Sequence, residues 1–158
     1  MPSRLGPIPV CTMKRLLILS IILLATGLPA QSLRLVDDGE ARAVIVLAAK
    51  PSAAATMGAK ILSDHLFQIS GARLKTVKED QVAAADSVLI FVGASQLSAK
   101  LGAQAGEFGP GEILIKSYPN ALVLLGADDP LSSDANGTRY AVTTFLEDRL
   151  GVRFLWPG

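Results

Sequence analysis

The sequence predicts an α/β domain in which two long helices cover one face of a mixed sheet of about four to six strands. Two segments, residues 54–69 and 138–150, repeat apolar residues at helical spacing and carry polar residues between them, which predicts two amphipathic helices. Short runs rich in valine, isoleucine and leucine lie around them and are typical of strands. Because each helix has only one apolar face, both are expected to pack on the same sheet.

The first strands are predicted before the first long helix. Leu33 and Leu35 lead into a turn sequence at 37–39, and the apolar run 43–47 follows it, so the pattern indicates two strands around a turn. Gly71 is expected to end the first helix as its C-cap. A short third strand is predicted over residues 74–77.

The middle of the chain contains the strand with the strongest signal. Residues 87–92 are apolar almost throughout and are followed by Gly93, a pattern typical of a strand that is covered on both faces and lies centrally in its sheet. Ser95 is expected to cap a short helix that runs through Leu101. The glycine-rich stretch 102–111 is predicted to be a loop.

A β-hairpin and the second long helix follow. The runs 113–115 and 122–125 flank a Tyr-Pro-Asn turn and predict the hairpin, and 152–154 is expected to form an exit strand after the second helix ends at Gly151. A doubly wound fold repeats strand–helix–strand units throughout. The hairpin therefore favours the two-layer sandwich.

The N-terminus has the features of a secretory signal peptide. Lys14 and Arg15 precede the apolar run 16–24, and helix-breaking residues then lead to a small-residue exit at Ala30. The run is shorter than the roughly 20 apolar residues that span a bilayer. We expect cleavage after residue 30 and export to the periplasm or the extracellular space, with a retained anchor as the alternative.

The charge balance and the cysteine count narrow the function classes. Removing Arg4, Lys14 and Arg15 with the leader leaves 12 basic against 14 acidic residues, from 15 and 14 in the whole chain. No basic stripe remains, which argues against nucleic acid or an anionic membrane as the partner. The single Cys11 precedes the apolar run, where a lipid-attachment cysteine would follow it. The exported part is thus expected to have no disulfide and no stable membrane anchor.

No catalytic, cofactor-binding or metal-binding set is predicted. His65 is the only histidine and is interpreted as structural, because a metal site or a triad needs further partners. An acidic loop that begins at Asp128 lacks calcium-loop spacing, and Gly93 alone is a weak nucleotide signal. The glycosylation sequence at 136–138 is more typical of a turn and helix cap.

The last residues carry the candidate interaction site. Arg153, Phe154 and Trp156 cluster where the chain leaves the domain. Packing of the aromatic side chains against a neighbouring domain is the favoured interpretation, and stacking on a sugar ring is the second.

The mature chain resembles a known type of domain over nearly its whole length. The opening at 38–46, the Ala-rich helix that ends at Ser70 and Gly71, and the ending GTRYAVTTFLEDRLGVRFLWPG resemble the N-terminal domain that precedes the catalytic barrel in bacterial alpha-glucuronidases and beta-hexosaminidases. The ending is most similar to that of large exported proteins with the same FLE, LGVR and WPG phrases.

This resemblance implies an exported, non-catalytic domain, residues 31–158, of a glycoside hydrolase-like protein that acts in polysaccharide breakdown. Its partner would be a catalytic barrel expected after Gly158, whose substrate is a polysaccharide or an oligosaccharide. The alternative is a stand-alone secreted module that binds carbohydrate or protein.

Overall fold

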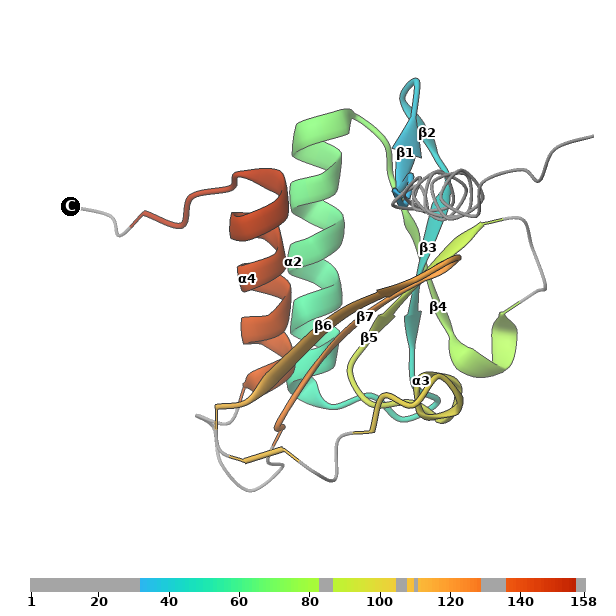
Figure 1. Ribbon diagram of the computed structural model, residues 1–158. Helices are drawn as coiled ribbons and strands as arrows, with labels where there is room; N and C mark the ends of the chain where they lie inside the picture. The colour runs from blue at the N-terminus through green and yellow to red at the C-terminus, as the bar shows by residue number, and fades with distance from the viewer. Residues whose placement is uncertain (1–31, 83–86, 105–107, 110, 129–135, 156–158) are drawn as a thin grey trace, which may run out of the picture. The chain divides into compact units, whose positions relative to one another are not determined.

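The fold is a mixed five-stranded sheet with two long helices on one face, as the sequence predicts. The computed structural model describes residues 32–82, 87–104, 108–109, 111–128 and 136–155 (Figure 1). The predicted signal peptide lies outside the described residues. Helices α2 (Ala53–Ser70) and α4 (Gly137–Leu150) run side by side on the sheet (Figure 1). Within the described ranges no helix is long and apolar enough to cross a membrane.

The sheet has the strand order β4-β3-β5-β7-β6. Four of its strands are parallel to one another, and the fifth, β6 (Ile113–Tyr118), is an antiparallel edge strand paired with β7. The four are β3 (Ala43–Leu47), β4 (Lys75–Lys78), β5 (Val88–Val92) and β7 (Ala121–Gly126). The predicted central position of the apolar strand β5 is confirmed. The carboxyl ends of the four parallel strands meet at one edge of the sheet.

The predicted pairing of the first strands is wrong in part. Strands β1 (Val36–Asp37) and β2 (Glu40–Ala41) form a separate small ribbon, whose turn holds Asp38 at φ 49° and Gly39 at φ 79°. Two positive φ values suit the tight turn of a right-twisted ribbon. The run 43–47 instead pairs in parallel with β4 and β5. A strand with apolar side chains on both faces is better placed inside the sheet than in an exposed ribbon.

The two long helices begin and end where local chemistry dictates. The Ser52 hydroxyl caps α2 by accepting the Ala55 N–H at 2.9 Å, and Gly71 ends the helix at φ 74° with its own N–H donated to the Phe67 carbonyl. Gly151 ends α4 in the same left-handed conformation, at φ 70°. Both predicted glycine caps are confirmed.

Apolar side chains fill both faces of the sheet. On one face Ile45, Ile90 and Leu124 pack against the buried sides of α2 and α4. On the other face a smaller cluster around Phe91 and Val123 is covered by the short helix α3 (Gln96–Lys100) and the loop after it. The two clusters explain why the central strands are apolar at successive positions rather than at alternate ones.

Glycines allow the helices to approach the carboxyl ends of the strands closely. A Cβ atom at Gly126 would overlap the backbone of Gly137, and one at Gly137 would overlap the backbone at the end of β7. A Cβ atom at Gly93 would lie 2.6 Å from the Ala55 Cβ atom, in the first turn of α2. The starts of both long helices therefore lie directly against the ends of β5 and β7.

The predicted exit strand is wrong. Residues 151–155 pair with no strand among the described residues, and Gly151 itself is left-handed at φ 70°. The Val152 N–H donates to the Leu146 carbonyl at 3.1 Å, and the segment then leaves α4 on the side away from the sheet (Figure 1). A segment that leaves from the helix layer has no strand edge within reach, so its alternating pattern produces no strand.

Replacing Gly126 by alanine tests the close approach of α4 to β7. We expect the free energy of unfolding to fall by about 3 kcal/mol, because the new methyl group meets backbone atoms that cannot move aside. Thermal and chemical denaturation measure the change. Gly109→Ala is the control, since its Cβ atom would meet only the flexible side chain of Glu112 at 3.6 Å. Equal stability of the two variants would contradict the proposed packing.

Candidate functional site

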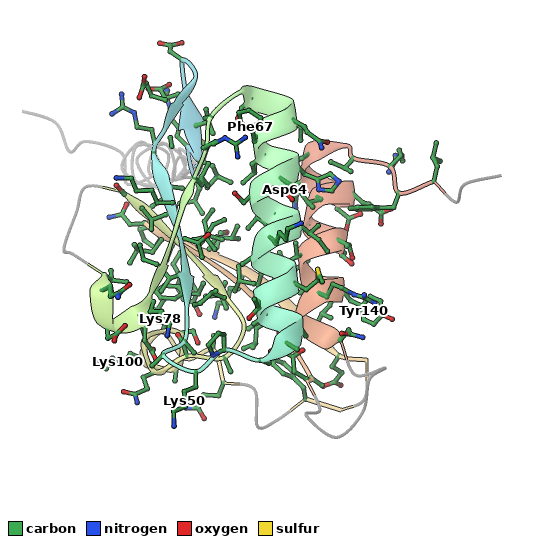
Figure 2. All side chains as sticks on the ribbon, turned by 180° about the vertical axis from the view of Figure 1, so that it is seen from behind. Lys50, Asp64, Phe67, Lys78, Lys100 and Tyr140 are labelled. Atoms are coloured by element: carbon green, nitrogen blue, oxygen red, sulfur yellow. The ribbon has the colours of Figure 1, made fainter. Side chains whose placement is uncertain are left out.

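The carboxyl edge of the sheet is the first place to look for a ligand site. In open α/β sheets ligands bind outside the carboxyl ends of the strands, where backbone N–H groups of loops and helix N-termini collect. In this chain the loops after β3, β4, β5 and β7 meet there, with the exposed Lys50, Lys78 and Lys100 around them (Figure 2). The edge therefore has the position of a ligand site, with three basic side chains around it.

The N–H donors after β3 and β5 already have a partner, the carboxylate of Glu79. One oxygen of this carboxylate accepts the Ala49 N–H at 3.1 Å. The other accepts the N–H of Gln96 at 2.8 Å and, more distantly, that of Leu97 at 3.4 Å. Glu79 follows β4 directly, so its side chain joins the loops that follow three parallel strands. These N–H groups thus bind an anion supplied by the chain.

A second carboxylate, Asp128, joins the starts of the two long helices. Its Oδ1 atom accepts the N–H of Thr138 in the first turn of α4 at 2.8 Å. Its Oδ2 atom accepts the hydroxyl proton of Ser52, the N-cap residue of α2, at 2.6 Å. The residue belongs to the acidic loop considered as a calcium site. Asp129 and Asp134 of that loop lie outside the described residues.

The loop after β5 is built for packing. Gly93 adopts φ 84°, and a Cβ atom added there would lie 2.6 Å from the Ala55 Cβ atom, so the start of α2 packs closely on the end of β5. Ser95 caps α3, and its hydroxyl and backbone N–H both bond to Ser98. The nucleotide interpretation of Gly93 therefore gains no support from the structure, because the nearby donors serve the fold.

Thr138 is a buried polar residue with an unpartnered hydroxyl. Its side chain has 0% exposure, and its Oγ1 atom makes no hydrogen bond. The preceding Gly137 is buried as well, with its N–H donated to the Ala127 carbonyl at 3.1 Å. The glycosylation sequence at 136–138 thus lies at the start of α4, with Asn136 in the N-cap position. The expected cap chemistry of Asn136 is not seen, because its side chain makes no capping hydrogen bond and Asp128 accepts the Thr138 N–H instead.

The predicted site at the end of the chain is only partly described. Arg153 and Phe154 are exposed, Leu155 has 85% exposure, and Trp156 lies outside the described residues. The Phe154 ring packs on the ring of His65 in α2, with 5.1 Å between the centroids and a tilt of 56°. Phe154 nevertheless keeps 41% exposure. The structure therefore brings together an aromatic pair from α2 and the exit segment.

His65 has a structural role in this pair. Its Nδ1 atom lies 2.8 Å from the Ile61 carbonyl oxygen one helical turn earlier, so the ring that contacts Phe154 is held against α2. The interpretation of this histidine as structural agrees with these contacts. Across the described ranges there is no group of acidic, histidine or cysteine side chains that could hold a metal ion.

Other exposed apolar side chains lie on the same helix layer. Met57 has 50% exposure on α2. Tyr140, labelled in Figure 2, has 48% exposure on α4. Phe67 differs from them, because the Arg73 guanidinium covers its ring at 4.0 Å. We call Phe154, Leu155 and His65 the exit corner. Among the described residues, Phe154 and Leu155 are exposed apolar side chains adjacent in sequence, and Phe154 contacts His65 of α2.

The carboxylates at the carboxyl edge, Glu79 and Asp128, have structural roles, which limits the chemistry that this edge can perform. Hydrolysis of a glycosidic bond needs two carboxyl groups that flank the bond. Glu79 and Asp128 instead each accept hydrogen bonds from their own chain. Sequence reasoning did not identify either as a cap. The sequence did contain a signal for these caps. Each is an acidic residue at or near the end of a predicted strand, and a helix begins after it in the chain.

Removing the Asp128 carboxylate tests its role at the helix starts. Asp128→Ala is expected to lower the free energy of unfolding by about 2 kcal/mol, because two hydrogen bonds to a charged group are lost. Chemical denaturation measures the effect. Asp64→Ala is the control, since Asp64 is exposed and pairs only with Lys60, at 3.6 Å. If both variants lose the same small amount, Asp128 does not hold the helix starts.

Thr138→Val is expected to raise stability by about 1 kcal/mol. The substitution keeps the shape of the side chain and replaces an unpartnered buried hydroxyl by a methyl group. Thr138→Ser is the matched control, because it keeps the hydroxyl and leaves a small cavity, and it should lower the melting temperature. A valine variant less stable than the parent would show that the hydroxyl has a partner in solution.

Comparison with known proteins assigns no function to these sites. No family model matches the sequence, and no curated protein matches it. The exit corner and the carboxyl edge are therefore interpreted from their own residues.

Proposed function

We propose that this chain is the exported, non-catalytic N-terminal domain of a glycoside hydrolase-like protein of the alpha-glucuronidase-like type. Its role is to pack against a following catalytic barrel that acts on a polysaccharide or an oligosaccharide. The proposal starts from the resemblance of the segments at 38–46 and 137–158 to such domains. The contacts of the described residues support it in two ways.

The observation that carries the proposal is the exit corner. The chain leaves α4 with Val152 packed on the core and Phe154 held on His65, so the direction in which the chain departs is determined by packing. Leu155, with 85% exposure, then presents an apolar side chain to solvent next to the half-covered Phe154 ring. Apolar groups at such a point are suited to contact a domain that continues the chain.

The carboxyl edge of the sheet supports a non-catalytic role. The N–H donors where α/β domains bind ligands are bonded to Glu79 and Asp128, and the starts of the helices pack directly on Gly93 and Gly126. Carboxylates of the chain itself thus occupy N–H donors that a ligand would otherwise bind. The surface of such a domain can serve for packing.

A stand-alone carbohydrate-binding module is the second candidate, and one observation favours it. The Phe154 ring is exposed on one side and supported on the other by His65, and a supported ring of this kind can stack on a sugar. The exposed rings of Phe67 and Tyr140 are less suitable for stacking on a sugar, because an arginine guanidinium lies over each. Arg73 covers Phe67, and the Arg139 guanidinium lies 5.5 Å from the Tyr140 ring centroid.

The codons after Gly158 test the proposal first. We expect several hundred codons with alternating strand and helix patterns. In the protein that they encode, Phe154→Ala should lower the melting temperature by several degrees and leave KM for an oligosaccharide unchanged, because the ring packs between domains. Calorimetry and steady-state kinetics measure the two effects.

The control is Phe67→Ala, which removes an aromatic ring from α2 away from the exit corner. It should leave the contact between the domains intact. A stop codon directly after Gly158, together with binding of residues 32–158 to a glycan array that is lost in Phe154→Ala, would overturn the packing role in favour of the binding module.

A further inference from the structure

The edge strand β6 presents unpaired backbone groups. It is the outermost strand of the sheet beyond β7, and in the part of the chain that the structure describes no strand pairs with its other side (Figure 1). Such an edge is a template for a further strand unless charges, proline or a short length protect it. The opposite edge, β4, has four residues with a lysine at each end. Strand β6 has six residues and begins with three apolar ones.

The hydrogen bonds of β7 show which groups of β6 point outward. The N–H groups of Leu89 and Gly93 in and after β5 donate to the carbonyls of Asn120 and Leu124. Even-numbered residues of β7 therefore face β5, and odd-numbered residues face β6. Given the register, Leu114, Lys116 and Tyr118 of β6 bond to β7. The residues left with outward N–H and C=O groups are Ile113, Ile115 and Ser117.

Two kinds of side chain alternate along this edge. Ile113 and Ile115 are half-buried on the face that carries the helices. Leu114 lies on the opposite face, and Lys116 and Glu112 share that face because side chains alternate along the strand. The Glu112 carbonyl accepts the Ala127 N–H at 3.2 Å, so the ladder with β7 continues to this residue. On the face opposite the long helices, the edge therefore carries an acidic residue (Glu112), a leucine (Leu114) and a basic residue (Lys116) in that order.

We propose that two copies of this chain associate through antiparallel pairing of their β6 strands about a two-fold axis at Leu114. This register places Ile113 opposite Ile115 of the second copy, so that their outward N–H and C=O groups bond to one another. On the other face Leu114 meets its own copy. Glu112 stands opposite Lys116 of the second copy on both sides of the axis.

In this register each side chain from Glu112 to Lys116 lies opposite a side chain of matching character in the second copy, and a shifted register loses this match. Apolar groups face apolar groups, and both charges face opposite charges, which stabilises cross-strand pairs. Moving the axis by one residue to Ile115 would place Lys116 opposite Leu114 and leave Glu112 opposite Tyr118. Strand pairing alone buries a small interface, so the dimer is expected to be weak and dependent on concentration.

The experiment uses residues 32–158, which form a compact unit. Sedimentation equilibrium of the parent chain is expected to show a monomer–dimer equilibrium. Lys116→Glu should weaken association by at least about tenfold, because it places two pairs of acids opposite one another. The double variant Glu112→Lys with Lys116→Glu restores opposite charges and should recover most of the loss. Melting curves recorded by circular dichroism check that each variant is folded.

Hydrogen exchange of the parent chain provides a test that needs no variant. The amides of Ile113 and Ile115 should become protected as protein concentration rises, while those of Leu114 and Lys116 are protected at all concentrations. A monomer at every concentration would overturn the proposal. So would a dimer that Lys116→Glu leaves unchanged, or one whose added protection lies on α2 and α4 instead.

Discussion

The structure depends most on the close approach of its two long helices to the ends of the parallel strands. At Gly126 and Gly137 two backbone segments are in contact with no side chain between them, and Gly93 gives α2 the same access to β5. This proximity puts the Asp128 carboxylate within reach of both helix starts. The packing of the helix layer and the capping interactions at this edge follow from the same contacts.

The carboxyl edge also shows how an α/β sheet can be completed without a ligand. Helix N-termini and the loops beside them present N–H groups that attract anions. In this chain Glu79 and Asp128 supply that negative charge from positions close to strand ends. Both side chains bond to groups from other elements, so they stabilise the relative positions of the loops as well as single helix ends.

The two interaction surfaces that we propose among the described residues differ in physical character. The exit corner offers apolar and aromatic side chains, whose contacts are stabilised by burial of area and tolerate many partner shapes. The β6 edge offers backbone groups in a fixed register, which select a strand as partner and select its direction. Because the corner lies on the helix layer and the edge lies at the side of the sheet, the proposed domain packing and the proposed pairing of copies use different residues.

Much of the fold could be predicted from the sequence, because local rules governed the elements concerned. The amphipathic repeats of α2 and α4, the glycine caps at Gly71 and Gly151, and the central apolar strand β5 each depend on residues adjacent in the chain. The prediction failed at the pairing of residues 43–47 and at the exit segment. Alternation of apolar residues indicates an extended chain, but the partner of a strand depends on which edge lies nearby.

The candidate site divides in the same way. Sequence alone indicated that Phe154 lies at the exit of the domain, since its position after the last helix is a local fact. Only the tertiary structure decided that Phe154 meets His65 and that Glu79 and Asp128 cap elements distant in sequence. The signals for a helix lie within a few adjacent residues, so they can be recognised from the sequence. Contacts between residues 76 positions apart, such as Ser52 and Asp128, exist only after the sheet has brought the two strand ends together.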